Sequence, residues 1–200
     1  MDLRLTNKDH EKIFSHIKGY KKLNKVYEED GSYLAKGDCL KTLKTIYELQ
    51  NTKVDLVYID PPFSTNTEFR VSSNGGRTST ISSSKNDVLA YSDKLTGEEY
   101  LDFIRNVLIA LKQVMSDDAS IYFHIDYKIG HYIKIIMDEV FGFNNFKNDI
   151  TRIKCNPKNF QRRSYGNIKD LILFYAQGDY TWNNPTTKHS QSDIERLFLR

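Results

Sequence analysis

Apolar and polar positions alternate along the middle of the chain in a way that predicts strands separated by helices. Residues 54–60 read VDLVYID, a short β-branched run typical of a buried strand. Between residues 101 and 115 an apolar residue recurs every three or four positions, which predicts a helix that buries one face. The strands predicted in this way are residues 54–60, 120–126, 149–154 and 169–176, and a second helix is predicted at residues 129–141.

The ends of these segments support the same division. Thr96-Gly97-Glu98-Glu99 has the form of a capping box that opens the first helix, with Thr96 as the N-cap. Gly142 stands where the second helix should end, because glycine readily adopts the left-handed conformation of a helix C-cap. A turn at residues 116–119 would then lead from the first helix into the next strand. Strands alternating with helices are typical of a mostly parallel sheet, so we predict an α/β fold.

The segments before and between these elements are less regular. Residues 7–22 predict a charged, weakly amphipathic helix capped by Thr6. A short strand at residues 33–36 and a helix at residues 40–49 follow. Residues 64–97 form a long polar segment, and a connection of this length inside a compact domain is either a functional lid or a disordered segment.

The composition is that of a soluble globular chain. Of the 200 residues, 39% are hydrophobic and 28% are charged, which suits one domain with a sizeable core. No apolar run approaches the roughly 18 residues needed to span a bilayer, and the N-terminus lacks the apolar core of a signal peptide. Cys39 and Cys155 show neither CxxC spacing nor a disulfide framework. We therefore expect a cytoplasmic protein with free thiols.

The positive charge is concentrated in the last quarter of the chain. The formal net charge is only +3, but residues 147–200 hold ten Lys and Arg against five Asp and Glu, whereas residues 1–146 hold nineteen against twenty-one. Clustered Lys and Arg form either a solvated loop or a footprint for phosphate groups, and the sequence leaves both open. The basic cluster consists of Lys154, Lys158, Arg162 and Arg163.

The candidate chemistry lies where the first central strand stops, at Asp60-Pro61-Pro62-Phe63. In open α/β sheets, ligands bind at the carboxyl ends of strands. Two successive prolines force a stiff, extended turn whose carbonyl groups have no N–H partner in their own segment. The Asp60 carboxylate and a proline carbonyl would together accept hydrogen bonds from an amino group, and Phe63 offers a flat apolar face. The alternative is a structural turn in which Asp60 is only a cap.

Several segments together resemble the β group of amino-directed DNA methyltransferases, which includes type III modification subunits. Asp60-Pro61-Pro62-Phe63 resembles motif IV of that family, (Asp/Asn/Ser)-Pro-Pro-(Tyr/Phe/Trp). The segment KGDCL resembles one that the family carries upstream of this motif, and YSD, SIYFHID and DEVFG follow it in the family's order. The resemblance covers roughly residues 33–182.

The resemblance implies a fold and a division of the chain. The fold would be a partial Rossmann-like sheet of the S-adenosylmethionine-dependent methyltransferases, with helices on both faces. Residues 1–32 would form an N-terminal helical extension, and residues 33–182 a partial catalytic domain in which residues 64–97 are a lid-like loop. Residues 183–200 would form a polar tail.

The resemblance also implies an activity. A methyl group would be transferred from S-adenosylmethionine to N6 of adenine in double-stranded DNA, within a restriction-modification system. Asp60 and the Pro61 carbonyl would accept hydrogen bonds from the adenine amino group, Pro62 would stiffen the turn, and Phe63 would stack on a base turned out of the duplex. Asp at the first motif position favours adenine, because cytosine-N4 enzymes usually carry Ser there.

Further residues gain candidate roles from the resemblance. Asp38 is the best upstream candidate for a contact with the cofactor, and a helix cap is the rival interpretation. The basic cluster Lys154, Lys158, Arg162 and Arg163 is placed like segments that line the target-base pocket and the DNA backbone in relatives. A metal site at His124, Asp126 and His131 is disfavoured because their spacing matches no standard set of ligands.

One family motif is missing. Phe-x-Gly-x-Gly, which binds S-adenosylmethionine, does not occur in the chain, and in the β group it lies beyond the target-recognition segment. The resemblance therefore implies the N-terminal catalytic part of a longer or split enzyme. Without the strand of that motif, residues 54–60 would form an unpaired sheet edge, which favours association. We expect a complementary methyltransferase half or a second copy as partner; a non-catalytic subunit that binds DNA or such a half is the alternative function.

Overall fold

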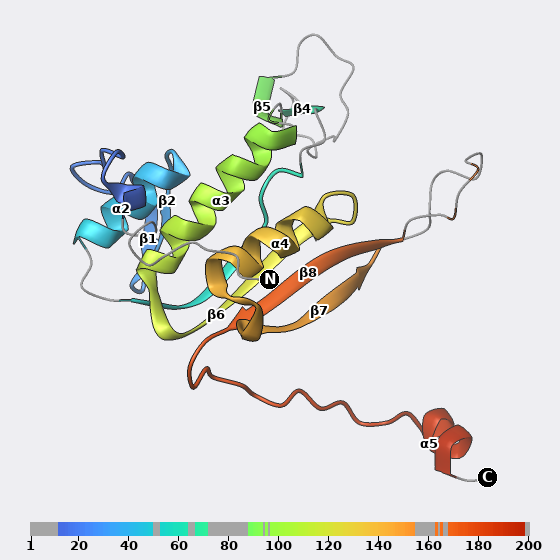
Figure 1. Ribbon diagram of the computed structural model, residues 1–200. Helices are drawn as coiled ribbons and strands as arrows, with labels where there is room; N and C mark the ends of the chain where they lie inside the picture. Colours follow the sequence, from blue (N-terminus) through green and yellow to red (C-terminus); the bar gives the residue numbers. More distant parts are fainter. Residues whose placement is uncertain are drawn as a thin grey trace.

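The computed structural model describes residues 12–49, 53–63, 67–71, 88–93, 95, 97–154, 163, 165 and 168–198 (Figure 1). The elements in chain order are η1 (Lys12–Phe14), β1 (Lys25–Glu29), β2 (Ser32–Ala35), α2 (Cys39–Leu49), β3 (Val54–Ile59), β4 (Thr67–Val71), β5 (Val88–Asp93), α3 (Gly97–Val114), β6 (Met115–Asp126), α4 (Gly130–Phe141), η2 (Phe143–Asn145), β7 (Phe146–Ile153), β8 (Lys169–Ala176) and α5 (Gln191–Phe198). None of the described helices is both long and apolar enough to cross a membrane.

The central element is a four-stranded sheet in the order β3-β6-β8-β7. The strand pair β3/β6 is parallel, whereas β6/β8 and β7/β8 are antiparallel. The strands β3, β6 and β7 of this sheet therefore run in one direction, as predicted, and β8 is reversed, which makes the sheet mixed. The helix α4 carries the chain across so that β7 runs in the direction of β6, as the strand–helix–strand pattern predicted. The chain then reverses and inserts β8 between them, and a strand reached by a reversal without a helical crossover lies antiparallel to its predecessor.

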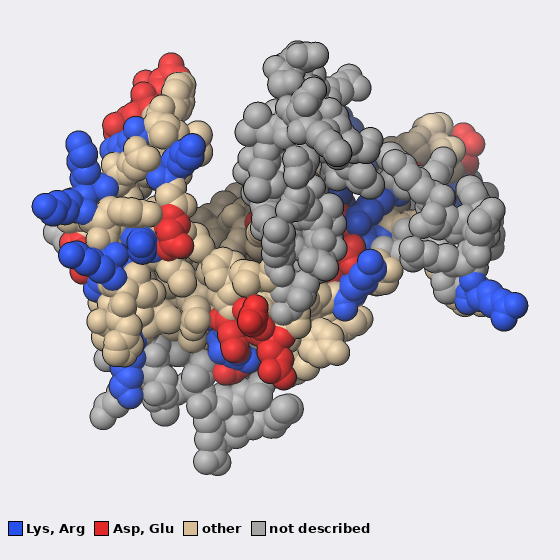
Figure 2. Space-filling model, turned by 90° about the horizontal axis from the view of Figure 1, so that it is seen from above, with Lys and Arg blue, Asp and Glu red and all other residues tan. Residues whose placement is uncertain are grey.

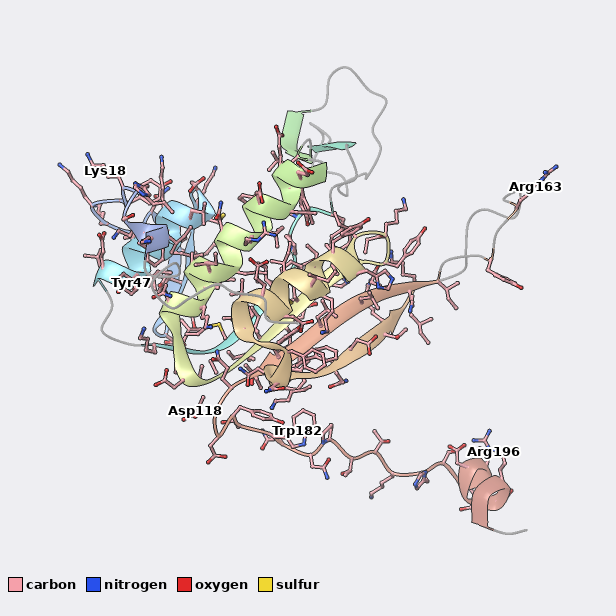
Figure 3. All side chains as sticks on the ribbon, in the orientation of Figure 1. Lys18, Tyr47, Asp118, Arg163, Trp182 and Arg196 are labelled. Carbon is pink, nitrogen blue, oxygen red and sulfur yellow. The ribbon has the colours of Figure 1, made fainter. Side chains whose placement is uncertain are left out.

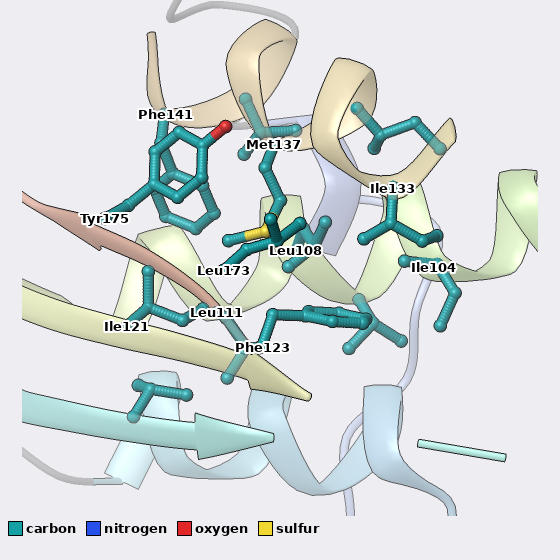
Figure 4. Packing of buried hydrophobic residues seen from close by; sticks show 14 of the residues in the cluster. Ile104, Leu108, Leu111, Ile121, Phe123, Ile133, Met137, Phe141, Leu173 and Tyr175 are labelled. Atoms are coloured by element: carbon teal, nitrogen blue, oxygen red, sulfur yellow. The ribbon is translucent and has the colours of Figure 1, made fainter. Parts of the chain in front are cut away.

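The core lies between this sheet and the helices α3 and α4 (Figures 1 and 4). Ile104 and Leu108 of α3 are fully buried, as the apolar stripe predicted, and they pack against Phe123 of β6. The predicted α/β class with a partial sheet is confirmed. Within the described residues, however, α3 and α4 share one face of the sheet, and no helix packs on the other face, where helices were also expected.

The opposite face of the sheet is covered in part by the chain that follows β8. Phe174 is buried between Tyr122, whose ring stacks on it at 4.4 Å, and Trp182, at 6.0 Å. Trp182 thus anchors the tail against the sheet (Figure 3). Leu56 and Tyr58 of β3 point to this face and are 62% and 60% exposed.

The strand β3 lies at one end of the described strand order, and no described strand pairs with its outer side. The unpaired edge that the missing motif led us to expect is therefore present in the described part of the chain. Unpaired N–H and C=O groups along such an edge invite pairing with another strand.

The N-terminal region differs most from its prediction. Over the described part of residues 7–22 only the short η1 is helical, and β1 was not predicted; Thr6 lies outside the described residues. Phe14 is buried and packs on Tyr47 of α2 with ring centroids 5.0 Å apart. The N–H of Tyr20 donates to the hydroxyl of the buried Thr45 (2.8 Å), so this segment follows α2 as an irregular chain instead of forming a helix.

Other boundaries fall close to their predictions. The helix α2, the helix α4 and the strand β8 begin and end within one residue of the predicted positions, and Gly142 has the positive φ of 90° that its place after α4 requires. The expected turn at residues 116–119 is instead the first part of β6. Thr96 lies outside the described residues.

The long polar segment contains a feature that its composition did not indicate. The strands β4 and β5 form an antiparallel ribbon at its two ends. The intervening residues 72–87 lie outside the described residues, so the choice between lid and disorder is untested. The division of the chain at residues 32 and 182 likewise stays a prediction.

Candidate functional site

The Asp60-Pro61-Pro62-Phe63 turn leaves the carboxyl end of β3 and is tied down from α3. Tyr100, in the first turn of α3 and only 1% exposed, donates its hydroxyl to the Pro62 carbonyl (2.6 Å). None of the described hydrogen bonds uses the Pro61 carbonyl. The Asp60 side chain is 55% exposed. The turn is thus rigid on one side and presents a carboxylate and a carbonyl group on the other.

The Asp60 carboxylate meets His124 of the neighbouring strand. Ile59 pairs with Phe123 in the parallel ladder, so the next residues, Asp60 and His124, come side by side on the face away from the helices. The His124 Nδ1 atom lies 3.0 Å from the Asp60 Oδ1 atom. The Phe63 ring stands edge-on to the imidazole, with centroids 5.4 Å apart and planes at 88°. His124 therefore touches both residues that the sequence proposes for contact with a base.

A buried carboxylate lies on the other side of His124. Asp170, at the second position of β8, is 1% exposed, and its Oδ2 atom lies 3.5 Å from His124 Nε2. Arg152 of β7 approaches the same oxygen at 3.0 Å, and Lys154 forms an ion pair with the Oδ1 atom. Lys154 also lies 3.7 Å from Asp126. A carboxylate removed from water requires such compensation, and residues of β6 and of the end of β7 provide it here.

The two described residues of the predicted basic cluster, Lys154 and Arg163, lie apart. Lys154 lies at the site, but its ammonium group is paired with two carboxylates instead of standing free. Arg163 is exposed, and Figure 3 shows it far from the sheet, on the segment between β7 and β8. Lys158 and Arg162 lie outside the described residues.

A second group of basic residues was not predicted. Figure 2 shows Lys and Arg side chains gathered over the N-terminal elements at the left. Exposed members of this group are Lys12, Lys18, Lys21 and Lys22. These four lysines lie close together in the sequence. Acidic residues elsewhere in residues 1–146 cancel their charge in the total for that range, so the total did not reveal the group.

A hollow of about 500 Å³ opens beside Phe63. Its walls combine apolar side chains with two carboxylates and one ammonium group. It is lined by Phe63, Gly97, Glu98, Leu101, Asp126, Lys128, Ile129 and Tyr132. A concave space with mostly apolar walls and a few polar groups is the usual form of a small-molecule or base pocket.

Asp38 holds the position of a helix cap. Its Oδ1 atom accepts a hydrogen bond from the backbone N–H of Lys41 (2.9 Å), which is the N-cap interaction of α2. The rival interpretation of Asp38 therefore has a geometric basis. The side chain is also exposed, so its second carboxylate oxygen is accessible to a ligand.

No metal centre is found among the described residues. His131 is exposed on α4, and the Asp170 carboxylate beside His124 is paired with Lys154 and Arg152. Both ring nitrogens of His124 lie within ion-pair distance of a carboxylate, and Asp126 accepts a hydrogen bond from the backbone N–H of Lys128. The sequence missed Tyr100, Arg152 and Asp170. The available signal for Asp170 was its place as a charged residue at the start of a strongly apolar strand.

The turn at Asp60 and the strands around it lie within the part of the chain that matches a known protein family. Residues 54–198 match the sequence profile of the N6/N4 DNA methylases, and the chain belongs to this family. The resemblance found from short segments is thereby confirmed. The matched residues include the Asp60 turn, β6 and β8, whereas Asp38 lies before them.

The chain is similar to several methyltransferases of restriction-modification systems. It is 37% identical to the type II methyltransferase M.EcaI of Enterobacter cloacae over 141 residues, which cover 70% of this chain and 28% of that protein. It is 24% identical to the type III EcoPI Mod subunit of Escherichia phage P1 over 174 residues, covering 82% of this chain and 27% of the relative. The chain thus spans less than a third of the length of these two relatives.

Among solved structures, the chain is similar to M1.HpyAVI, which was crystallised as a complex with SAM. The TM-score is 0.46 and the sequence identity 19%, covering 77% of this chain and 60% of the other.

Proposed function

We propose that this chain provides the target-base site of an S-adenosylmethionine-dependent DNA methyltransferase that acts on N6 of adenine. The observation that carries the proposal is the half-exposed Asp60 carboxylate at the end of β3, beside a Pro61 carbonyl that none of the described hydrogen bonds uses. Two acceptors that converge on one point fit an amino group with two N–H donors. The family membership of the chain supports the same chemistry.

In the proposed reaction, the residues of this chain orient the adenine amino group for attack. The N6 lone pair of adenine is conjugated with the ring and is a poor nucleophile. Hydrogen bonds from the amino group to Asp60 and to the Pro61 carbonyl favour a pyramidal nitrogen whose lone pair is free to attack. Holding reactants in line accounts for a large part of the rate enhancement in such transfers. S-adenosylmethionine would supply the methyl group as a sulfonium electrophile and leave as S-adenosylhomocysteine, and the proton lost from N6 would pass to water.

The base has to leave the duplex to reach this point. Phe63 forms one wall of the hollow beside the turn, and Leu101, Ile129 and Tyr132 add further apolar surface. We propose that the base enters here and stacks on Phe63. Asp38 would contact the cofactor through the carboxylate oxygen that does not cap α2.

Double-stranded DNA is the proposed macromolecular partner. Arg163, Lys158 and Arg162 would contact phosphates on one side, whereas Lys154 would stabilise the site from within. Replacing Arg163 by Ala should weaken DNA binding and reduce the salt dependence by about one phosphate contact. Fluorescence anisotropy of a labelled duplex at several salt concentrations measures both quantities. An unchanged slope would remove Arg163 from the interface.

The activity is tested without knowledge of the recognition sequence. We expect a host that lacks DNA methylation to acquire N6-methyladenine when it expresses the chain, and mass spectrometry of its nucleosides detects this product. Asp60→Ala should abolish the product. The matched control is Asp55→Asn, which changes a carboxylate at the opposite end of the same strand. N4-methylcytosine instead of N6-methyladenine would refute the assignment to adenine.

The unpaired edge of β3 favours a second candidate function, in which the chain is a non-catalytic subunit that binds a complementary half or a second copy. Leu56 and Tyr58 expose apolar surface next to this edge. Calorimetric titration with S-adenosylmethionine separates the two functions. Tight binding by the isolated chain supports a catalytic role, whereas absence of binding supports the subunit.

A further inference from the structure

The proposed function leaves one buried group without a role. His124 is 7% exposed, and both of its ring nitrogens face carboxylates: Nδ1 faces Asp60 at 3.0 Å and Nε2 faces Asp170 at 3.5 Å. We propose that His124 is a positioning residue, fixed by buried Asp170 and holding one oxygen of Asp60 so that the other oxygen faces the incoming amino group. This inference rests on the proposed function and assigns a specific role within the same site.

The strands determine the geometry of this bridge. In the register of the sheet, Ile59 pairs with Phe123, and Asp126 pairs with Asp170. His124 therefore lies beside Asp60 and two residues from the position opposite Asp170, all on the same face. Strand positions within a hydrogen-bonded ladder are held more rigidly than loop positions. A bridge across three such strands fixes the imidazole more firmly than the Asp60 turn could do alone.

The contacts leave room for a small adjustment on binding. Neither ring nitrogen of His124 makes an aligned hydrogen bond, although both lie within ion-pair distance of an oxygen. Buried polar atoms favour satisfied partners, so a small rotation of the ring that aligns an N–H with a carboxylate is favourable. A neutral imidazole donates to one of the two carboxylates, and an imidazolium donates to both. Contacts that are long or poorly aligned in a free enzyme commonly tighten when the substrate binds.

His124 also positions the second residue of the site. The Phe63 ring stands edge-on to the imidazole at 5.4 Å. An edge-to-face pair restricts the tilt of both rings. The same side chain thus limits the orientation of the carboxylate that binds the amino group and of the ring that stacks on the base. A histidine that only filled space in the core would not require contacts with both Asp60 and Phe63.

Because of the charges around it, His124 can be replaced to test its positioning role without unfolding the protein. Asp170 keeps Arg152 at 3.0 Å and its ion pair with Lys154 when His124 is replaced. Asp60 is half exposed and remains solvated. Loss of His124 therefore leaves no buried carboxylate without compensation, and the folded state should survive the substitution.

Two substitutions of His124 separate its contact with Asp60 from its contact with Asp170. In His124→Asn the side-chain amide nitrogen takes the place of Nδ1 and still reaches Asp60. In His124→Gln the amide takes the place of Nε2 and reaches only Asp170. We expect the Gln variant to lose about 100-fold in kcat, with little change in KM for DNA, because the acceptor is displaced and not removed. The Asn variant should recover a substantial part of that loss.

The kinetic experiment uses tritiated S-adenosylmethionine and genomic DNA from a methylation-free host, with the full chain. Equal activity of the two variants, or a kcat unchanged from that of the parent chain, would overturn the positioning role. A rise in KM for DNA at constant kcat would overturn it as well, because that pattern indicates lost binding and not lost orientation.

A second measurement does not depend on methyl transfer. In long-range ¹H–¹⁵N spectra of the histidine rings, His124→Asn identifies the signals of His124. We expect Asp60→Asn to shift the Nδ1 resonance and Asp170→Asn to shift the Nε2 resonance, whereas Asp55→Asn shifts neither. If Asp60→Asn leaves Nδ1 unmoved, the bridge does not exist, whatever the activity. If the shifts occur but the parent chain yields no methylated base, the bridge stands and the proposed function fails.

Discussion

The two faces of the central sheet are built for different tasks, and the strand β6 shows this within consecutive residues. Phe123 points toward α3 and α4 and is fully buried in apolar surroundings. His124 points to the opposite face and reaches Asp60 and Asp170. Because successive side chains of a strand alternate between faces, packing on one face fixes the positions of polar groups on the other. The same strands thus support packing and the proposed chemistry, and Phe63 contributes to both because it also packs against the core.

The open face is itself divided. Its carboxyl edge carries the charged group around Asp170, whereas Leu56 and Tyr58 lie farther back with most of their surface exposed. Exposed apolar surface next to an unpaired strand edge is a site for association. The comparison therefore predicts a large cost for changes on the helix face, an intermediate one at the charged edge, and little cost at the exposed positions.

The largest effect is expected on the helix face. Phe123→Ala removes a fully buried ring from the middle of the core and should lower the free energy of unfolding by about 4 kcal/mol. Urea unfolding followed by circular dichroism measures the change. A loss below about 1 kcal/mol would mean that this face is loosely packed and that the comparison fails.

The next largest effect is expected at the charged edge. Asp170→Ala leaves Arg152 and Lys154 facing each other without their shared carboxylate. It should lower the free energy of unfolding by about 3 kcal/mol. This value is at the lower end for a broken buried ion pair because Arg152 is 56% exposed. Thermal unfolding provides the measurement. Asp179→Ala, at an exposed position just after β8, is the control and should leave the melting temperature unchanged.

A smaller effect is expected between β8 and α4. The Tyr175 hydroxyl donates to Asp138 Oδ1 (2.7 Å), and its removal in Tyr175→Phe should cost about 1 kcal/mol.

The same residue gives a pH dependence. Burial, and then the hydrogen bond and charge of Asp138, raise the pKa of Tyr175 far above its ordinary value of 10.0. The folded state therefore holds this proton more tightly than the unfolded state. The stabilisation from the protonated Tyr175 hydroxyl is fully present below pH 10.0, and the free energy of unfolding declines as the pH rises above that value. Tyr175→Phe should remove this alkaline decline; an identical pH profile in both proteins would contradict the assignment.

The smallest effect on stability is expected at the exposed positions. Tyr58→Ser should change the free energy of unfolding by less than about 0.5 kcal/mol. It should nevertheless reduce self-association, because it removes apolar surface beside the β3 edge. Sedimentation velocity at several concentrations tests this, with Ile135→Ser, at an exposed position of α4, as the control. A parent chain that sediments as a monomer at every concentration would show that the open face does not bind a second copy.

Much of the fold could be predicted because its signals are local. The apolar period of α3, the β-branched run of β3 and the glycine after α4 each specify an element within a few residues. The hairpin of β1 and β2 was missed although its signal is equally local: Asp30-Gly31 has positive φ at both positions, the conformation that Asp-Gly turns adopt. Over residues 12–22, the described part of the helix predicted at 7–22, apolar spacing misled because this segment packs on α2 as an irregular chain.

The sequence by itself determined the family, the α/β alternation and the turn that carries Asp60, because these reside in contiguous residues. Only the tertiary structure decided the antiparallel insertion of β8, the helices on one face, and the ion pairs of Lys154. It also brought together Asp60, His124 and Asp170, which are separated by up to 110 residues. Their meeting depends on strand order and register, which are set by packing across the whole sheet and leave no local trace in the chain.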